Sequence, residues 1–204
     1  IAVAELSFAL MLAVPNRLIE GHNGMKDGKW LKKELKRTEL FGKTLGLLGI
    51  GNIGTEVAKR AAAFGMKIIA YRQSDKPSDY AEVVANVDEL YARADYISIH
   101  LPLNDGSKGM IDAAAIAKMK DGVIIVNTGR GKVVIEPDLA AALTSGKVAA
   151  YATDVWYSDP PADDCPLLHA PNVIMTPHIG ASTKENMGRI GEIAVQIISD
   201  FIKD

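Results

Sequence analysis

The sequence predicts an α/β fold, in which a doubly wound parallel sheet is covered by helices on both faces. Short apolar runs alternate with helical segments over most of the chain, as expected where helices connect parallel strands. The runs are apolar throughout rather than at every second residue, which is typical of strands buried on both faces. A glycine-rich turn follows the first run, at residues 49–54. Such a turn commonly joins a strand to a helix in these folds.

Each predicted strand is a short apolar run bounded by turn-forming residues. The strands are expected at residues 44–49, 67–71, 96–100, 123–127, 149–154 and 173–176, with a weaker candidate at 82–84. The helices are expected at 54–64, 87–93, 112–118, 137–144 and 182–202. Pro137 suits the first turn of its helix, and Gly146 suits the exit from it.

A further helix is expected before the sheet. Val3, Leu6, Leu10 and Ala13 recur at helical spacing, which predicts an amphipathic helix that we extend over residues 1–20. The first fourteen residues have no basic segment, contain Glu5 and are too short to span a bilayer, so we expect neither a signal peptide nor a membrane partner. Residues 1–40 are therefore interpreted as a helix with a connecting arm, and residues 41–204 as one domain.

Composition restricts the kinds of partner. The 204 residues are 48% hydrophobic with a formal net charge of -2, which fits an ordinary globular protein and disfavours nucleic-acid binding. Cys165 is the single cysteine, so no disulfide can form within the chain, and a cytoplasmic location is expected. No pattern of metal ligands is recognised, and no metal is expected.

The turn at residues 49–54 matches G-x-G-x-x-G in the context that its mechanism requires, between a strand and a helix. Gly49 allows the tight turn, Gly51 leaves room for a pyrophosphate, and Gly54 lets helix and strand pack closely. The helix N-terminus offers free N–H groups to the phosphates. A dinucleotide is therefore the expected ligand.

The residue at the end of the next strand usually selects the dinucleotide. An acid there binds the ribose of NAD, but this chain has Arg72, whose guanidinium suits the 2'-phosphate of NADP. The cofactor is therefore expected to be NAD or NADP, with NADP favoured. Asp75 could restore NAD binding if the turn bends back.

Polar residues follow three later strands, at the edge where open sheets bind ligands. Arg130, flanked by glycines, is placed to hold a carboxylate through two parallel hydrogen bonds. Asp154 and His178 follow the next two strands, and His178 is the histidine best placed for acid–base work. A surface arginine and a structural histidine remain the alternatives from these segments alone.

Several ordered motifs together resemble the D-isomer-specific 2-hydroxyacid dehydrogenases over essentially the whole chain. They are Gly-Ile-Gly-Asn-Ile-Gly at 49–54, His-Leu-Pro-Leu at 100–103, Asn-Thr-Gly-Arg-Gly at 127–131, Thr-Asp-Val-Trp at 153–156 and Thr-Pro-His-Ile-Gly-Ala-Ser-Thr at 176–183. The segments at 25–30, 38–40 and 181–185 look most like the D-3-phosphoglycerate dehydrogenases. The fold implied is a Rossmann-type domain, with residues 1–20 similar to an interdomain helix.

The resemblance implies a role for each matching residue. Arg130 would orient the substrate carboxylate, and His178 would exchange a proton with the substrate oxygen while hydride moves to or from the nicotinamide. The family usually has Glu where this chain has Asp159, the partner of the histidine, and the Asp side chain is about 1.5 Å shorter. We expect the loop to compensate through Ser158 and Pro160; the alternative is a weakened pair of histidine and carboxylate. The implied cofactor-binding residues are Gly49, Gly51, Asn52, Ile53, Gly54, Arg72, Leu101, Pro102, Ser107, Thr128, Asp154 and Gly180.

The implied activity is hydride transfer between NAD(P) and a D-2-hydroxy acid, with 3-phosphoglycerate first and glyoxylate or hydroxypyruvate next. Most of the family's substrate domain is missing from this chain, so we expect it to bind dinucleotide without efficient turnover. A homodimer through the cofactor domain is also implied. Two alternatives share the fold: a formate dehydrogenase, which Asp159 fits poorly, and a dinucleotide-sensing co-repressor that binds partner proteins.

Overall fold

The structure is a computed structural model that describes residues 1–73 and 77–203. Its centre is a seven-stranded sheet in which all neighbouring strands are parallel, in the order β3-β2-β1-β4-β5-β6-β7. The predicted doubly wound parallel sheet is therefore confirmed. The strands are β1 (Thr44–Leu48), β2 (Lys67–Tyr71), β3 (Glu82–Val84), β4 (Tyr96–Ile99), β5 (Val123–Asn127), β6 (Val148–Thr153) and β7 (Val173–Met175).

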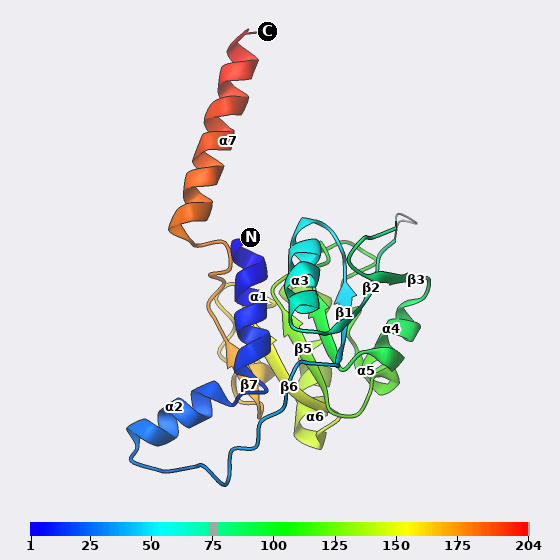
Figure 1. Ribbon diagram of the computed structural model, residues 1–204, viewed down its shortest axis with the longest axis vertical. Helices are drawn as coiled ribbons and strands as arrows, with labels where there is room; N and C mark the ends of the chain where they lie inside the picture. The colour runs from blue at the N-terminus through cyan, green and yellow to red at the C-terminus, as the bar shows by residue number, and fades with distance from the viewer. Residues whose placement is uncertain (74–76, 204) are drawn as a thin grey trace.

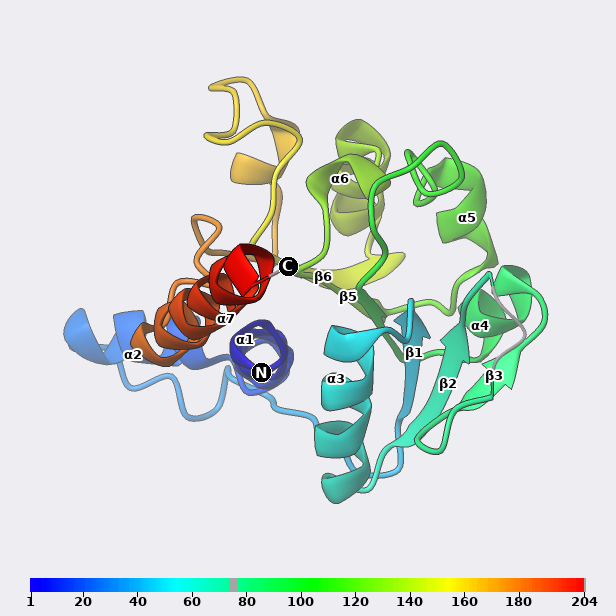
Figure 2. The same ribbon diagram turned by 90° about the horizontal axis from the view of Figure 1, so that it is seen from above.

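Helices cover both faces of the sheet. Figure 2 shows α1 and α3 on one face and α4, α5 and α6 on the other. Each face has its own apolar core cluster, since the strands are buried on both sides. The helices of these two layers are α1 (Ala2–Ala13), α3 (Asn52–Ala63), α4 (Val87–Arg93), α5 (Ala113–Lys118) and α6 (Glu136–Ser145).

Local sequence explains several helix ends. Asn86 and Asp112 cap α4 and α5, because their side chains accept the N–H groups of Asp88 and Ala115. Pro137 lies in the first turn of α6, and Gly146 ends that helix with φ of 80°, as predicted. α3 begins two residues earlier than expected, at Asn52.

The expected single helix over residues 1–20 is wrong. α1 ends at Ala13, and a second helix, α2 (Leu18–Lys26), begins after Arg17, whose φ is 53°. Pro15 accounts for the break, because it has no amide hydrogen and its ring clashes with the preceding turn. The two helices make an angle of 65°.

The amphipathic pattern expected for α1 is also wrong. Within the helix only Glu5 and Ala9 are exposed, whereas Phe8 and Met11, outside the expected face, are buried. α1 packs against α3 on one side and against β5 and β6 on another, so it is covered on nearly all sides.

The last helix, α7 (Lys184–Lys203), differs from the others because it projects away from the sheet (Figure 1). Nearly all of its described side chains are exposed, including several large apolar ones. In the described part of the chain no single helix is long and apolar enough to cross a membrane, although α1 and α2 would pass as a bent pair by length and composition.

Candidate functional site

The glycine turn lies where the winding of the sheet changes direction, between the neighbouring strands β1 and β4. Ligands of open α/β sheets bind outside the carboxyl ends of the strands at such a point. There the structure forms a cavity of about 290 Å³ from three loops, which follow β1, β2 and β4. Its walls include predicted cofactor residues from all three: Gly49, Gly51, Arg72, Leu101, Pro102 and Ser107.

The three positions of the turn differ in the geometric reason for having glycine. Gly49 has φ of 93°, and a Cβ there would lie 2.9 Å from the carbonyl oxygen of His100. A Cβ on Gly54 would lie 2.4 Å from the carbonyl oxygen of Gly49. A Cβ on Gly51, by contrast, would meet nothing within 4 Å. The fold therefore requires glycine at 49 and 54, whereas Gly51 borders open space. This fits a cradle for a pyrophosphate.

Asn52 and Ile53 are exposed in the first turn of α3, beside this opening. Ser107 is buried, and its hydroxyl donates to the carbonyl oxygen of Pro102 at 2.6 Å while accepting the N–H of Asn104 at 2.9 Å. Its hydroxyl therefore shapes the loop that walls the cavity. Asp75, the alternative anchor for NAD, lies outside the described residues.

Sequence reasoning missed several residues of the cavity wall. Those not predicted are Ile50, Tyr71, Gln73, His100, Asn104, Gly106 and Met110. All of these except Met110 directly flank or lie between predicted residues, so position along the three loops would have found them. His100 stands out, because its Nδ1 is buried with no hydrogen-bond partner among the described residues. Its Nε2 lies 2.9 Å from the Ser98 hydroxyl, and burial lowers the pKa of His100 to about 4.

A second group of predicted residues meets beside α1. Thr128 is buried, and its hydroxyl lies 2.6 Å from that of Ser7, a residue of α1 that sequence reasoning missed. Its available signal was the single hydroxyl in a helix whose other residues, apart from Glu5, are apolar. A Cβ on Gly180 would lie 3.5 Å from Leu6 and 2.9 Å from Asp154. α1 therefore closes one side of the region of Thr128, Asp154 and Gly180, which the resemblance implies would line the nicotinamide.

His178 and Asp159 form the polar pair that the resemblance implies. Nδ1 of His178 lies 2.5 Å from Oδ2 of Asp159, and both side chains are about half exposed. The aspartate therefore reaches the histidine despite its shorter side chain. In the same loop the Ser158 hydroxyl donates to the carbonyl oxygen of Pro160 at 2.9 Å. The other ring nitrogen, Nε2, is the atom that could exchange a proton with a ligand.

Asp154 organises the backbone around His178. Its buried carboxylate accepts the Thr176 hydroxyl at 2.7 Å and the N–H groups of Ile179 and Gly180 at 2.8 Å each. These bonds enclose His178, whose φ of 57° is a conformation that costs energy in most non-glycine residues. The carboxylate stabilises that turn through charge-assisted hydrogen bonds.

Asn127 holds the backbone of the turn that carries Arg130 in a similar way. It is fully buried, accepts the N–H of Gly129 at 3.0 Å and donates to the carbonyl oxygen of Arg130 at 3.1 Å. Its amide also donates to the hydroxyl of Tyr151 at 3.2 Å. Arg130 itself is exposed, and Nη1 donates to the carbonyl oxygen of Gly129 at 2.7 Å. Much of the guanidinium thus faces solvent at the sheet edge, where it can bind a carboxylate.

No group of three or more His, Cys, Asp or Glu side chains is placed to hold a metal ion in the ranges 1–73 and 77–203. The arrangement instead offers a phosphate cradle, an acid–base pair and a cation. Residues 8–180 match the family described as D-isomer specific 2-hydroxyacid dehydrogenase, NAD binding domain.

The chain belongs to this family.

Two relatives illustrate the match. The chain is 47% identical over 205 residues to the hydroxypyruvate reductase of Thermotoga maritima, covering 100% of the chain and 66% of that protein. It is 40% identical over 206 residues to the D-3-phosphoglycerate dehydrogenase of Archaeoglobus fulgidus, covering 100% of the chain and 39% of that protein. The chain therefore spans two thirds or less of these dehydrogenases.

Solved structures of the family agree with the fold. A glyoxylate reductase from Paecilomyes thermophila has a TM-score of 0.93 at 37% identity, with 100% of this chain and 62% of that chain covered. An NAD-dependent formate dehydrogenase from Staphylococcus aureus, in complex with NAD, has a TM-score of 0.91 at 33% identity, with 98% and 61% covered. These matches and the glycine cradle identify a Rossmann-type domain that binds NAD.

The glycine geometry separates folding from cofactor binding. Gly51→Ala should leave the melting temperature unchanged, because its Cβ meets open space, but should weaken dinucleotide binding about tenfold or more by crowding the pyrophosphate. Gly54→Ala should lower both stability and affinity, because its Cβ collides with the backbone of Gly49. Thermal unfolding and calorimetric titration measure the two effects. Full affinity in Gly51→Ala would contradict this placement of the pyrophosphate.

The lowered pKa of His100 predicts an acid-sensitive fold. As pH falls below about 6.5, the unfolded chain binds a proton at His100 that the folded chain takes up only near its pKa of about 4. His100 should therefore cost the folded state about 2 kcal/mol between pH 7.5 and 5. Urea unfolding at both pH values, without cofactor, should show a smaller loss in His100→Gln than in the unmodified chain. Equal losses would rule out this contribution, since the carboxylates titrate in both proteins.

Proposed function

We propose that the chain is the cofactor-binding part of an enzyme that transfers hydride between NAD(P) and a D-2-hydroxy acid or its 2-oxo acid. The observation that carries the proposal is the 2.5 Å contact between Nδ1 of His178, on the turn held by Asp154, and Oδ2 of Asp159. It lies at the same sheet edge as the glycine cradle and Arg130. That edge therefore has the parts which this reaction needs.

The residues divide the reaction between them. Arg130 holds the substrate carboxylate and polarises the neighbouring carbonyl. In reduction, His178 donates a proton to the carbonyl oxygen as the carbonyl carbon receives hydride; in oxidation the neutral imidazole removes the hydroxyl proton. Asp159 stabilises the imidazolium and orients its ring. The nicotinamide, when bound, supplies or accepts the hydride.

The names of the relatives support three substrates: hydroxypyruvate, 3-phosphoglycerate and glyoxylate. All three acids, or their oxidised or reduced partners, present a carboxylate beside the reacting carbon, which fits Arg130. The formate dehydrogenase shares the fold, but the His178–Asp159 pair supports proton transfer to a substrate oxygen, which formate oxidation does not need. We therefore place formate last.

Arg72 supports NADP as the preferred cofactor. It lines the cavity beside Gln73, at the end of β2, where the adenosine ribose binds in Rossmann-type folds. A guanidinium there would form charge-assisted hydrogen bonds to a 2'-phosphate.

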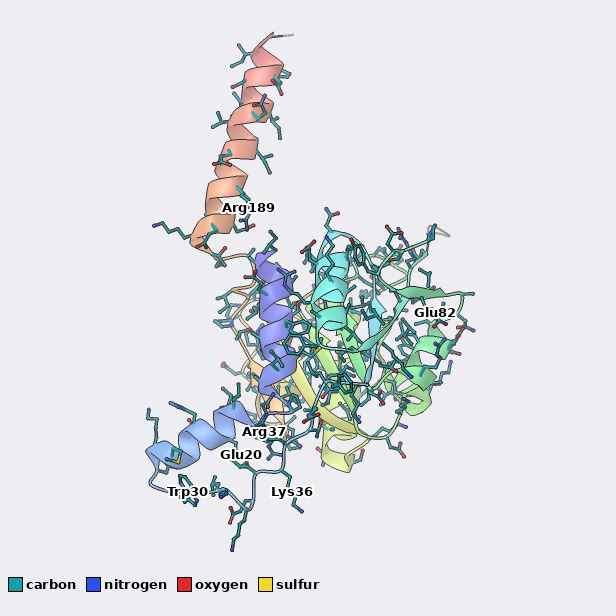
Figure 3. All side chains as sticks on the ribbon, in the orientation of Figure 1. Glu20, Trp30, Lys36, Arg37, Glu82 and Arg189 are labelled. Carbon is teal, nitrogen blue, oxygen red and sulfur yellow. The ribbon has the colours of Figure 1, made fainter. Side chains whose placement is uncertain are left out.

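Cofactor preference is tested by calorimetric titration with NADH and with NADPH. NADPH should bind more tightly, and Arg72→Gln should lower its affinity about tenfold or more while changing NADH little. The matched control is Arg189→Gln, on the projecting helix α7 (Figure 3). Tighter NADH binding in the unmodified chain would reject the NADP preference.

A further domain is proposed to complete the enzyme. Two observations support this. The chain spans only part of its relatives' length. In addition, α7 exposes apolar side chains, among them Ile193, Ile197 and Phe201. A helix that exposes such a surface normally packs against a partner. We propose that the substrate domain packs there and that the 204-residue chain binds cofactor without efficient turnover.

Turnover is tested by hydroxypyruvate-dependent oxidation of NADH and NADPH, with glyoxylate, 3-phosphohydroxypyruvate and an unrelated 2-oxo acid in parallel, and with formate-dependent cofactor reduction as a separate arm. The comparison is with a longer enzyme, defined as this chain together with the proposed substrate domain. The 204-residue chain alone should turn over at least 100-fold more slowly than this longer enzyme, because Arg130 and His178 would then lack the groups that position the substrate. Comparable rates would contradict the need for a second domain. An inactive longer enzyme would reject the proposed function.

We also propose a homodimer formed through the cofactor domain. Leu18 and Ile19 of α2 are more than half exposed and line a cavity of about 490 Å³ with α1 and the first residues of β6 and β7. This cavity lies at the amino ends of the strands, opposite the cofactor site, so a second copy can cover it without blocking the cofactor.

For location, the buried thiol of Cys165 supports a reducing, cytoplasmic compartment, which cell fractionation would test.

The dimer is tested by sedimentation equilibrium. Ile19→Glu should give a monomer, because it places a charge on the proposed contact, and it should keep its fold, because the side chain is exposed. Ile193→Glu on α7 is the matched control and should remain dimeric. A monomeric unmodified chain, or dissociation by the α7 variant alone, would contradict this interface.

A further inference from the structure

Trp156 lies at the junction of the three segments that carry the proposed reacting groups. Its indole N–H donates to the carbonyl oxygen of Thr176 at 3.2 Å, two residues before His178. Its own backbone leads directly into the loop of Asp159, three residues later. A Cβ on Gly131 would lie 2.0 Å from the backbone of Trp156, so this backbone packs directly on the residue that follows Arg130.

The contacts depend on features that other residue types lack. Tryptophan combines a large apolar ring with an N–H donor. The ring is 8% exposed and belongs to the core cluster under α4, α5 and α6. Its rotation is therefore restricted, and the direction of the N–H is fixed. Phenylalanine would fill much of this space without donating the hydrogen bond.

The indole bond joins two loops that are also connected by the bonds of Asp154 and by the His178–Asp159 pair itself. The Thr176 amide donates to the carbonyl oxygen of Thr153 at 2.9 Å, and its hydroxyl donates to Asp154. These bonds tie the loop after β7 to the end of β6. The Thr176 carbonyl is held by the indole instead, and the indole belongs to the segment that leads to Asp159. The indole bond therefore adds a link between the segment that leads to His178 and the segment that leads to Asp159.

We propose that Trp156 is a positioning residue that aligns Arg130, Asp159 and His178, and that its indole N–H holds the His178–Asp159 pair in register for proton transfer. The inference rests on the proposed function. Trp156 acts through Thr176 and Gly131 and is not itself placed against the substrate. A displacement of about 1 Å at such groups costs on the order of 100-fold in rate.

The hydrogen bond is tested first on the unmodified chain, which has two tryptophans. Trp30 is 74% exposed and lies on the arm away from the sheet (Figure 3). When the exchange of indole N–H protons with solvent is followed by NMR, the proton of Trp156 should exchange far more slowly than that of Trp30. Equal exchange rates would overturn the proposal, because the bond to Thr176 would not persist in solution.

The positioning role is tested with Trp156→Phe in the longer enzyme, with Trp30→Phe as the matched control. Trp156→Phe should lower kcat for 2-oxo acid reduction about tenfold or more, while the Kd of the cofactor stays within about twofold. The control should leave both unchanged, and circular dichroism monitors the fold.

The outcomes separate the two proposals. Unchanged kcat in Trp156→Phe, with an active unmodified enzyme, would overturn the role of Trp156 alone. Parallel loss of kcat, cofactor affinity and helical signal would also overturn it, because the residue would then serve only the fold. An inactive unmodified enzyme would overturn the proposed function together with this role.

Discussion

The carboxylate of Asp154 is the interaction on which the candidate site depends. It is buried at the end of β6 and accepts three hydrogen bonds from the turn that contains His178. A buried charge is unfavourable unless it is paired or fully hydrogen-bonded, so the carboxylate strongly constrains the turn around it. The left-handed backbone of His178 is tolerated because neighbours on both sides are held. Loss of these bonds would free both the turn and its histidine.

The sheet brings the loops of the candidate site together at one edge. Parallel strands end at one edge. Loops after β1, β2 and β4 therefore form the cavity of about 290 Å³, while loops after β5, β6 and β7 carry Arg130, Asp159 and His178. α1 contacts the loop after β5 through the Ser7–Thr128 pair. The glycine turn and the His178–Asp159 pair therefore lie at one edge of the sheet, and their relative position follows from strand order.

α1 and α7 show that the apolar residues of a helix can be either buried or exposed. Both contain many apolar residues, yet α1 is covered by α3, β5 and β6, whereas α7 extends from the domain with its apolar residues exposed (Figure 1). Helical periodicity reports which residues can share a face, but burial depends on which elements are present to cover them. The error in the expected face of α1 has this cause, since the pattern assumed one covered side and the fold covers nearly all of them.

The sequence by itself determined the order of strands and helices, the glycine turn and the residues that reach the carboxyl edge. These features depend on local chemistry: apolar runs, Gly49 with a positive φ, and Pro137 and Gly146 at the ends of α6. Tertiary structure alone decided the break after α1, the contact of Ser7 with Thr128, the bonds of Asp154 and the position of Trp156 against Gly131 and Thr176. Most of these are contacts between residues distant along the chain, whose partners depend on strand order and loop geometry. The break after α1 has a local signal in Pro15, but only the packed structure decided between a kink and two separate helices.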